Sequence, residues 1–516
     1  MVSFGVLSIV PILIAVFLSI KTKNVVLSLF SSVFCGIFIL NNYNPLETTK
    51  VLVGKYFINQ LTDSYNAGVI VLMIFIGGFI ELMMMSGGAY AFAESFKNSI
   101  NSKRKAQLLA YFTGIMIFFS DLGTPLIVGP IFNPFFKRLK ISKEKLAFIL
   151  DSTSSPVAVL VPFIGWGVFI IGLLQKEFEL LNLNLSDYES FIKSIPFNIY
   201  PLLALTIIPT LTLLKLDFGP MKTFEDNLSL ESEVAENETT LDNSKYRVEN
   251  ARGSFVWLPI LVLLGTLFSM LGVSFITSRV SGGAFRAALT SGYLYAALVL
   301  MGLMLFYKSK TFKEIFSIYM NGMKKMSEII IILILAWSLG VINKDLGADQ
   351  FLISFLKSLD INSGFIPAIA FLFGAVISFS TGSSWGTFSI MIPLVIPMAL
   401  TFNAPLYVTI GAILSGGLFG DHVSPISDTT ILSSAGAGCD HIDHVKTQTP
   451  YALINAALAV TVFLIGGFTE NSYLIIFAII AQILILIGIK LITQKCFKGD
   501  EKCSTFQEDS KKQQVI

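Results

Sequence analysis

The sequence predicts an all-α integral membrane protein of two inverted-topology repeats, with re-entrant hairpins, broken helices and about 11 full spans plus two hairpins. Three observations lead to this fold class. The 516 residues are 54% hydrophobic and only 14% charged, and about 20 apolar residues suffice to cross a bilayer. Polar residues with Gly or Pro interrupt several apolar segments. These interruptions recur in the same order in both halves of the chain.

Composition also limits the partners. The formal net charge is +2, and the basic residues lie in short stretches between apolar segments. The positive-inside rule accounts for them better than nucleic acid does. Four cysteines lack the spacing of a disulfide framework or a zinc site and are expected to be unpaired thiols: Cys35, Cys439, Cys496 and Cys503. No cofactor is expected.

The first half contains a predicted hairpin. Three spans, at 1–20, 24–40 and 69–85, place the N-terminus outside, because Lys21 and Lys23 follow the first span. The next apolar segment, 106–136, is interrupted by SDLGTP and has basic residues on both flanks. Both of its ends are therefore expected on the cytoplasmic side, with Asp121 at the buried tip of a re-entrant hairpin.

The remainder of the first half predicts a broken helix and a linker. The apolar segment 146–174 is broken early by DSTSSP, at 151–156, and 195–214 returns to the cytoplasm. Residues 1–216 therefore form the first inverted repeat. Residues 217–252 are polar and rich in Glu and Asn, which predicts a flexible cytoplasmic linker.

The second half repeats this order. Residues 253–494 are predicted to form the second inverted repeat plus an extra C-terminal span, and 495–516 a cytoplasmic tail. The segment 364–400 carries STGSSWG at its middle and is expected to be an external hairpin. The segment 405–432 runs into GDHVSPISDTT, where Gly420 and Pro425 end the helix.

The spacing of these features supports two copies of one unit. Gly78 and Gly340 lie about 262 residues apart, as do Asp121 and Gly382. Five crossings and a hairpin in the first half make the second copy begin on the opposite side of the membrane. Inverted repeats with discontinuous helices near the midplane are typical of secondary transporters.

The four breaks supply Ser, Thr, Asp and carbonyl oxygens, which suit a small hard cation such as Na+. A carboxylate at such a site can hold either a proton or a cation, so competition for one Asp suffices for exchange. Na+ is expected at Asp121, Asp151 and Asp421. The candidate residues for binding of a cation, a proton or a substrate are Asp121, Thr124, Asp151, Ser152, Thr153, Ser380, Thr381, Ser383, Ser384, Trp385, Asp421, His422, Ser424 and Asp428.

Each candidate also has a purely structural interpretation. Ser and Thr in apolar helices usually bond to their own helix, and Asp428 is more typical of a helix cap. His422 either senses pH or simply forms a hydrogen bond. His441 and His444 fall in a predicted loop without a metalloenzyme spacing, and the role of Glu81 is open. No nucleophile elbow or metal-dependent hydrolase motif is present, so an enzyme is not expected.

At these residues the chain resembles the NhaC family of sodium/proton antiporters. The resemblance is carried by FGDHVSPISDTTILSSAGAGCDHIDHVKTQTPYA, FSTGSSWGTFSIMIPLVIPMA, AWSLGVINKDLGA and KEKLAFILDSTSSPVAVLVP. It implies an inverted-repeat transporter of the cytoplasmic membrane that exchanges Na+ for H+ by alternating access. In related members, transport of Na+ and H+ is coupled to small organic acids or amino acids.

One departure from the family pattern keeps that alternative open. Many members carry two adjacent acidic residues and a following Asn at the first hairpin tip, where this chain has Ser120, Asp121 and Thr124. The lost carboxylate raises the alternative of Na+- or H+-coupled transport of a small amino or organic acid, whose carboxylate would lie against half-helix N-termini. The expected partners are membrane lipid, Na+, H+ and such a solute, and a homodimer stays open.

Overall fold

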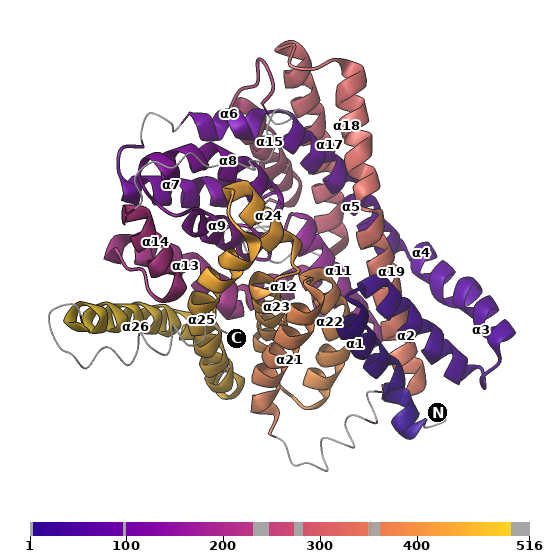
Figure 1. Cartoon of the computed structure of the whole chain (residues 1–516). Helices are drawn as coiled ribbons and strands as arrows, with labels where there is room; N and C mark the ends of the chain where they lie inside the picture. The colour runs from indigo at the N-terminus through magenta and orange to yellow at the C-terminus, as the bar shows by residue number, and fades with distance from the viewer. Residues whose placement is uncertain are drawn as a thin grey trace.

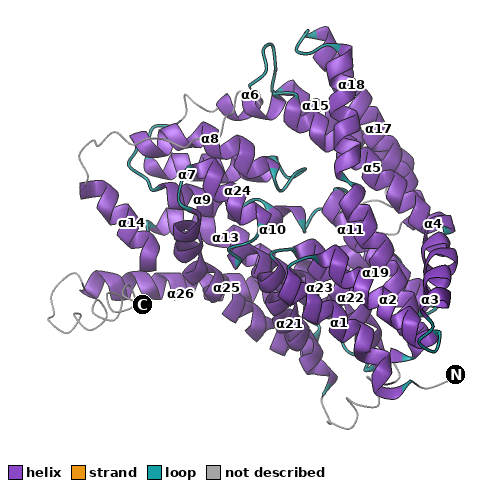
Figure 2. Cartoon of the chain, turned by 45° about the vertical axis from the view of Figure 1, so that its right-hand side comes forward, coloured by secondary structure: helices purple, strands orange, loops and turns teal. Residues whose placement is uncertain are grey.

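The structure, a computed structural model, consists of helices and loops throughout the part of the chain that it describes (Figure 2). The described residues are 4–95, 100–230, 247–272, 282–348, 351 and 362–496. Ten helices among them are long and apolar enough to cross a membrane, or up to 12 if each bent pair counts as one span. The predicted class, an all-α polytopic membrane protein, is confirmed.

Helices of the first half include the predicted spans and breaks, but residues 45–62, which were expected to be a loop, are helical as well. In chain order they are η1 (Gly5–Ile9), α1 (Val10–Thr22), α2 (Val25–Leu40), α3 (Pro45–Val51), η2 (Leu52–Phe57), α4 (Ile58–Thr62), α5 (Ser64–Met85), α6 (Gly88–Glu94), α7 (Lys103–Met116), α8 (Gly123–Arg138), α9 (Lys143–Ser152), α10 (Ser155–Ala158), α11 (Gly165–Leu180), α12 (Asp187–Ser194), η4 (Ile195–Phe197) and α13 (Ile199–Leu214). A sharp bend of 117° separates α2 from the helices at 45–62.

Helices of the second half follow a comparable order. They are α14 (Gly219–Leu230), α15 (Ser254–Leu271), α17 (Gly282–Phe306), α18 (Phe312–Lys325), α19 (Ser327–Leu346), η5 (Ser363–Phe365), α21 (Ile366–Thr381), α22 (Ser384–Thr401), α23 (Leu406–Val423), α24 (Asp428–Ala437), α25 (His441–Thr469) and α26 (Leu474–Cys496). In Figure 1, α26 extends to one side of the bundle and α3 to the other.

Both apolar segments predicted to double back form helical hairpins. The first is α7–α8, joined through residues 117–122, and the second is α21–α22. The second turn is very tight, because Gly382 caps α21 with φ of +65° and the Ser383 side chain caps α22 by accepting from the Gly386 backbone N–H. A Cβ on Gly382 would lie 2.7 Å from the Ile426 carbonyl oxygen, so a glycine is needed there.

Both predicted helix breaks are present as well. The first broken helix ends at Ser152 and resumes as α10, with Pro156 in the first turn, where the missing proline N–H has no helical partner to lose. The second ends at Val423 and resumes at Asp428, after a loop that contains Pro425. The polar breaks read from the sequence at 151–156 and 421–425 are therefore confirmed.

The contacts between helices recur in matching pairs. Helix α1 packs on α2 as α15 packs on α17, and α2 packs on α19 as α17 packs on α5. Around the breaks, α8 packs on α24 as α22 packs on α11, and α13 packs on α23 as α25 packs on α9. This correspondence supports the division into two repeats, whose boundaries stay a prediction.

The predicted linker 217–252 begins differently from expectation. Its first part is the helix α14, which packs against α25 and α9. Lys145 binds the Asp217 carboxylate at 2.7 Å, and Glu225 accepts from the Ser142 backbone N–H at 2.7 Å. Met221 is buried and Phe218 packs on the Tyr451 ring, with centroids 4.3 Å apart, so a few apolar contacts and these polar anchors hold the segment without a long apolar stripe. The remainder at 231–246 lies outside the described residues, as does the predicted tail from 497 onward.

Candidate functional site

A cavity of about 490 Å³ lies where three of the four predicted breaks meet. Ser120 and Asp121 come from the tip of the first hairpin, and Ser383 and Ser384 from the tip of the second. The break between α23 and α24 contributes further polar residues: Asp421, Ser427, Asp428 and Thr429. Segments more than 250 residues apart in the chain thus form one polar site, as the sequence predicts for these three breaks.

Asp421 lies on this wall at the end of α23. Its residue is only 5% exposed, and the Ser384 hydroxyl donates to its Oδ2 at 2.8 Å. The same hydroxyl lies 3.1 Å from the Gly417 carbonyl oxygen, one turn earlier on α23. The tip of the second hairpin therefore holds the carboxylate directly, and a buried carboxylate with so few donors favours a cation or a proton beside it.

Asp121 is held at the tip of the first hairpin. The Leu122 backbone N–H donates to its Oδ1 at 3.0 Å, and the Trp166 indole N–H donates to its Oδ2 at 3.1 Å. The Ser154 hydroxyl, in the first helix break, donates to the Asp121 carbonyl oxygen. Trp166 also contacts Trp385 of the second hairpin, with ring centroids 5.1 Å apart. The two hairpin tips are thus linked through an aromatic pair on the cavity wall.

The cavity wall is rich in carboxyl groups. Among the described residues, five lining side chains are carboxylates and one is basic: Glu81, Asp121, Glu328, Asp421 and Asp428 against Lys325. Glu81, whose role the sequence left open, binds Lys325 at 2.7 Å. Helices α5 and α18 come close enough for this pair because Gly77 faces Gly322, where a Cβ would lie 2.3 Å from the opposite carbonyl oxygen. Such a surface attracts cations.

Asp151 does not line this cavity. It is 0% exposed, and its Oδ2 accepts from the Thr430 hydroxyl at 3.1 Å and from the Gln448 amide at 2.8 Å. His444 Nε2 lies 3.4 Å from the same oxygen and His422 Nε2 lies 3.9 Å away. The three predicted carboxylates therefore divide between two places, with Asp121 and Asp421 on the cavity and Asp151 in a separate buried cluster.

The predicted loop around His441 and His444 is wrong. Both residues belong to α25, where Asp440 caps the first turn by accepting from two backbone N–H groups. His444 is fully buried against Asp151, whereas the His441 ring binds the Ser434 hydroxyl at 3.1 Å. The Asp440 cap was visible in the sequence, and it marks the start of a helix.

The other predicted residues off the cavity wall are Thr124, Ser152, Thr153, Ser380, Thr381, His422 and Ser424. Thr153 and Thr381 donate to carbonyl groups of their own helices, at 2.7 Å and 2.9 Å. Ser424 donates to the Phe379 carbonyl oxygen at 2.8 Å, which ties the second break to the second hairpin. The contacts of Thr153 and Thr381 match the interpretation that such hydroxyls bond to their own helix.

His422 connects two parts of the buried core. Its Nδ1 lies 2.7 Å from the Tyr200 hydroxyl, and its Nε2 lies 3.4 Å from the Ser152 hydroxyl. Thr124 makes a longer contact of 3.4 Å with the Gly114 carbonyl oxygen inside the first hairpin. These contacts fix the packing of the broken helices around the cavity.

Sequence reasoning missed several residues of the two polar places. Trp166 carries no local signal, because its partner Asp121 is 45 residues away. Thr430, His444 and Gln448 were missed as partners of Asp151, although His444 and Gln448 are four residues apart and share one face of α25. That spacing was the one available signal.

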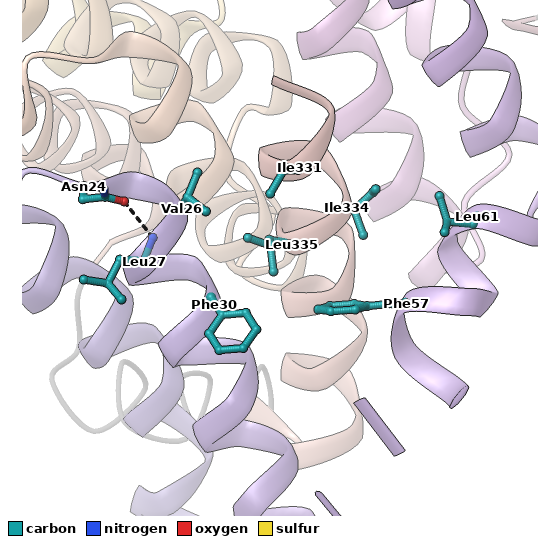
Figure 3. Close-up of a pocket in the computed structure, with 9 residues that line it drawn as sticks. All are labelled: Asn24, Val26, Leu27, Phe30, Phe57, Leu61, Ile331, Ile334 and Leu335. Carbon is teal, nitrogen blue, oxygen red and sulfur yellow. Dashed lines mark hydrogen bonds between the residues drawn. The ribbon is translucent and has the colours of Figure 1, made fainter. Parts of the chain in front are cut away.

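A second cavity of about 490 Å³ has a different character. It lies between α2, the helices at 52–62 and α19, and its lining is apolar except for Asn24 (Figure 3). The Asn24 side chain caps α2 by accepting from the Leu27 backbone N–H at 2.8 Å. Because the rest of the lining is apolar, this cavity suits an apolar group better than an ion.

A helical membrane bundle whose hairpin tips and helix breaks meet at an acidic cavity is a membrane transporter. Comparison with known proteins specifies it further. The family model described as the Na+/H+ antiporter family matches residues 157–468, and the chain belongs to that family. The predicted resemblance is confirmed.

Two relatives and one solved structure show how far the similarity extends. The chain is 33% identical to an uncharacterized protein of Haemophilus influenzae over 91% of this chain and 92% of the relative. It is 34% identical to the malate-2H+/Na+-lactate antiporter of Bacillus subtilis, over 18% of this chain and 20% of that one. The YdaH transporter of Alcanivorax borkumensis has the same fold, with a TM-score of 0.58 at 14% identity, over 81% of this chain and 89% of that chain.

Proposed function

We propose that this protein is a secondary active transporter that exchanges Na+ for H+ across the cytoplasmic membrane by alternating access. The observation that carries the proposal is the charge of the cavity wall, where five carboxylates face one lysine among the described residues. A wall of this kind concentrates cations, and membership in the Na+/H+ antiporter family supports Na+ and H+ as those cations.

Asp421 is the residue at which the two ions compete. Na+ binds the Asp421 carboxylate together with the Ser384 hydroxyl, which already lies 2.8 Å from it, and a proton on the same carboxylate excludes the cation. Asp121 adds a second carboxylate at the opposite hairpin tip. One buried group that holds either ion is sufficient for exchange, and no covalent step is needed.

Alternating access involves the two hairpins. Each tip is bonded to a helix break, through Ser154 to the Asp121 carbonyl and through Ser424 to the Phe379 carbonyl. Movement of a hairpin therefore changes the contacts of the breaks and the opening of the cavity together. In this scheme the chain has the topology predicted from the sequence, with the N-terminus outside the cell and the C-terminus in the cytoplasm.

A second candidate function is Na+- or H+-coupled transport of a small amino acid or organic acid. The volume of about 490 Å³ falls in the range of small-molecule sites and exceeds what a bare ion needs. Trp166 and Trp385 offer aromatic surface to such a solute. Ser384 and Asp428, the first residues of α22 and α24, also line the cavity, so a solute carboxylate can lie near helix N-termini.

Proteoliposomes with an imposed Na+ gradient and an internal pH dye test both functions. We expect the wild type to move protons when Na+ alone is supplied, and Asp421→Asn to lose this response. Asp443→Asn is the matched control, because it makes the same change at a partly exposed residue bound to Lys446. Proton movement only after addition of amino or carboxylic acids would instead establish the second function. Full activity of Asp421→Asn would contradict the site assignment.

A further inference from the structure

Two buried oxygen atoms without a partner line a small polar cavity that shares no lining residue with the acidic one. Glu177 is 2% exposed and Asn343 is 7% exposed. Glu177 Oε1 and Asn343 Oδ1 each lack a hydrogen-bond partner among the described residues. Both residues line a cavity of about 50 Å³, which has room for water. A buried polar atom left unpaired is costly, so a pair of them indicates that something binds there.

The two oxygens come from neighbouring helices. Glu177 lies in the last turn of α11 and Asn343 in the last turn of α19, and these helices pack on each other. Gly340 makes room for the carboxyl group, because a Cβ there would lie 2.5 Å from Glu177 Oε1. Gly340 and Asn343 are three residues apart, so Asn343 lies on the face of α19 that Glu177 contacts.

No basic group forms an ion pair with Glu177 among the described residues. Two lysines lie near it, but Lys176 binds Glu179 at 3.2 Å and Lys344 donates to the Leu180 carbonyl oxygen. The other helices packed on α11 are α5, α12 and α22, and α22 has no charged residue. The charged residues of α5 and α12 have other partners: Glu81 with Lys325, Asp187 with Tyr65, and Glu189 with Lys193. An ionised Glu177 would therefore be buried without a direct ion partner, which is costly.

A proton on Glu177 satisfies both oxygens together. A carboxylate and an amide oxygen are both acceptors and cannot pair with each other, whereas a protonated carboxyl group is also a donor. Its O–H can donate to Asn343 Oδ1, directly or through a water in the cavity. A turned Asn343 amide would instead donate to an ionised carboxylate, and chemical labelling separates these two states.

The position of the pair suits the passage of protons. Trp166, which donates to Asp121 at the acidic cavity, and Glu177 are eleven residues apart on α11, so they lie roughly 16 Å apart along the helix. The predicted topology puts the Glu177 end of α11 toward the outside. Asn343 follows Glu81 of the acidic cavity by 262 residues, the spacing that relates the two predicted repeats. Inverted copies put such matching positions on opposite sides of the membrane.

We propose that Glu177 and Asn343 form a proton-binding site at the outer end of α11, through which the exchanged proton passes between the outside and the acidic cavity. This inference rests on the proposed Na+/H+ exchange. Glu177 takes up the proton, and Asn343 stabilises its neutral form by accepting a hydrogen bond. Release toward the cavity then delivers the proton to the carboxylates there.

Labelling with dicyclohexylcarbodiimide, an apolar reagent that modifies protonated carboxyl groups shielded from water, tests the protonated state in the purified full-length protein. We expect mass spectrometry to find the label on Glu177, and to find less of it as the pH rises. Glu179 is the internal control, since it is 47% exposed and bound to Lys176, and it should stay unlabelled. A Glu177 that is unlabelled over the whole pH range would overturn the proton site.

The variant Glu177→Gln tests the passage of the proton. Glutamine keeps the size and polarity of the side chain but cannot release a proton, so Na+-driven proton movement in proteoliposomes should be lost even at saturating Na+. Equilibrium binding of ²²Na+ should stay at the wild-type level, which would show that the variant is folded. Glu177→Asp keeps a carboxyl group and should retain proton movement, and Glu179→Gln is the matched control with wild-type activity.

The proton site and the proposed function fail in different ways. If Na+ drives no proton movement in the wild type while Glu177 still takes up the label in a pH-dependent manner, Na+/H+ exchange is refuted and the proton-binding pair stands. If the wild type exchanges the ions and Glu177→Gln does so at the same rate, passage through Glu177 is refuted and antiport stands.

Discussion

Replacing Ser384 with alanine tests how the second hairpin supports the cation site. The substitution removes the hydroxyl that donates to Asp421 Oδ2 at 2.8 Å and leaves the buried carboxylate without that partner. A hydrogen bond to a charged group contributes about 1.5–3 kcal/mol, and 1.4 kcal/mol corresponds to a factor of about ten in affinity. We therefore expect the half-saturating Na+ concentration for proton movement to rise about tenfold or more.

The assay is Na+-dependent dye response in proteoliposomes, measured over a range of Na+ concentrations. Ser389→Ala is the control, since this buried serine lies on the same helix and donates to the Trp385 carbonyl oxygen of that helix. Its Na+ dependence should match that of the wild type. Equal Na+ dependence of Ser384→Ala and the wild type would show that the Ser384 hydroxyl does not act on the transported cation.

Two further changes test the packing and the charge of the cavity. In Gly436→Ala the added Cβ would lie 2.2 Å from the Pro125 carbonyl oxygen, so α24 must move away from α8, which costs about 1–3 kcal/mol of stability. The melting temperature in detergent should therefore fall. Gly265→Ala is the control, because an added Cβ meets nothing within 4 Å there, and it should not lower the melting temperature. Lys325→Ala removes the one basic residue among the described cavity lining, so the half-saturating Na+ concentration should fall, most clearly at low ionic strength. An unchanged melting temperature or an unchanged Na+ dependence would contradict the respective reasoning.

The breaks and hairpins could be predicted because their signals are local. Pro156 and Pro425 interrupt helices where they stand, and Gly382 permits a turn that other residues strain. Basic residues on both flanks predicted that the first of these segments doubles back. Such features depend on a few neighbouring residues, so they survive in a single sequence.

The partition of the three carboxylates could not be predicted, because it depends on packing between distant helices. Asp151 meets Thr430 and Gln448 across 279 and 297 residues of chain. A break places each Asp near the middle of the bundle, but only the approach of α24 and α25 to α9 decides which one faces the cavity. The α14 helix escaped prediction for a related reason, since its anchors Lys145 and Ser142 belong to another segment.

The end of α23 connects the acidic cavity with the buried cluster formed by Asp151, Thr430, His444 and Gln448. Asp421 faces the cavity, where Ser384 holds its carboxylate. The next residue, His422, accepts from Gln448 through its backbone carbonyl and lies 3.9 Å from Asp151 through its ring. Because consecutive residues cannot move independently, a displacement of the break that alters the contacts of Asp421 also alters those of Gln448. The acidic cavity and the buried cluster around Asp151 therefore share one helix end, so a link between them would run through direct packing at Asp421 and His422.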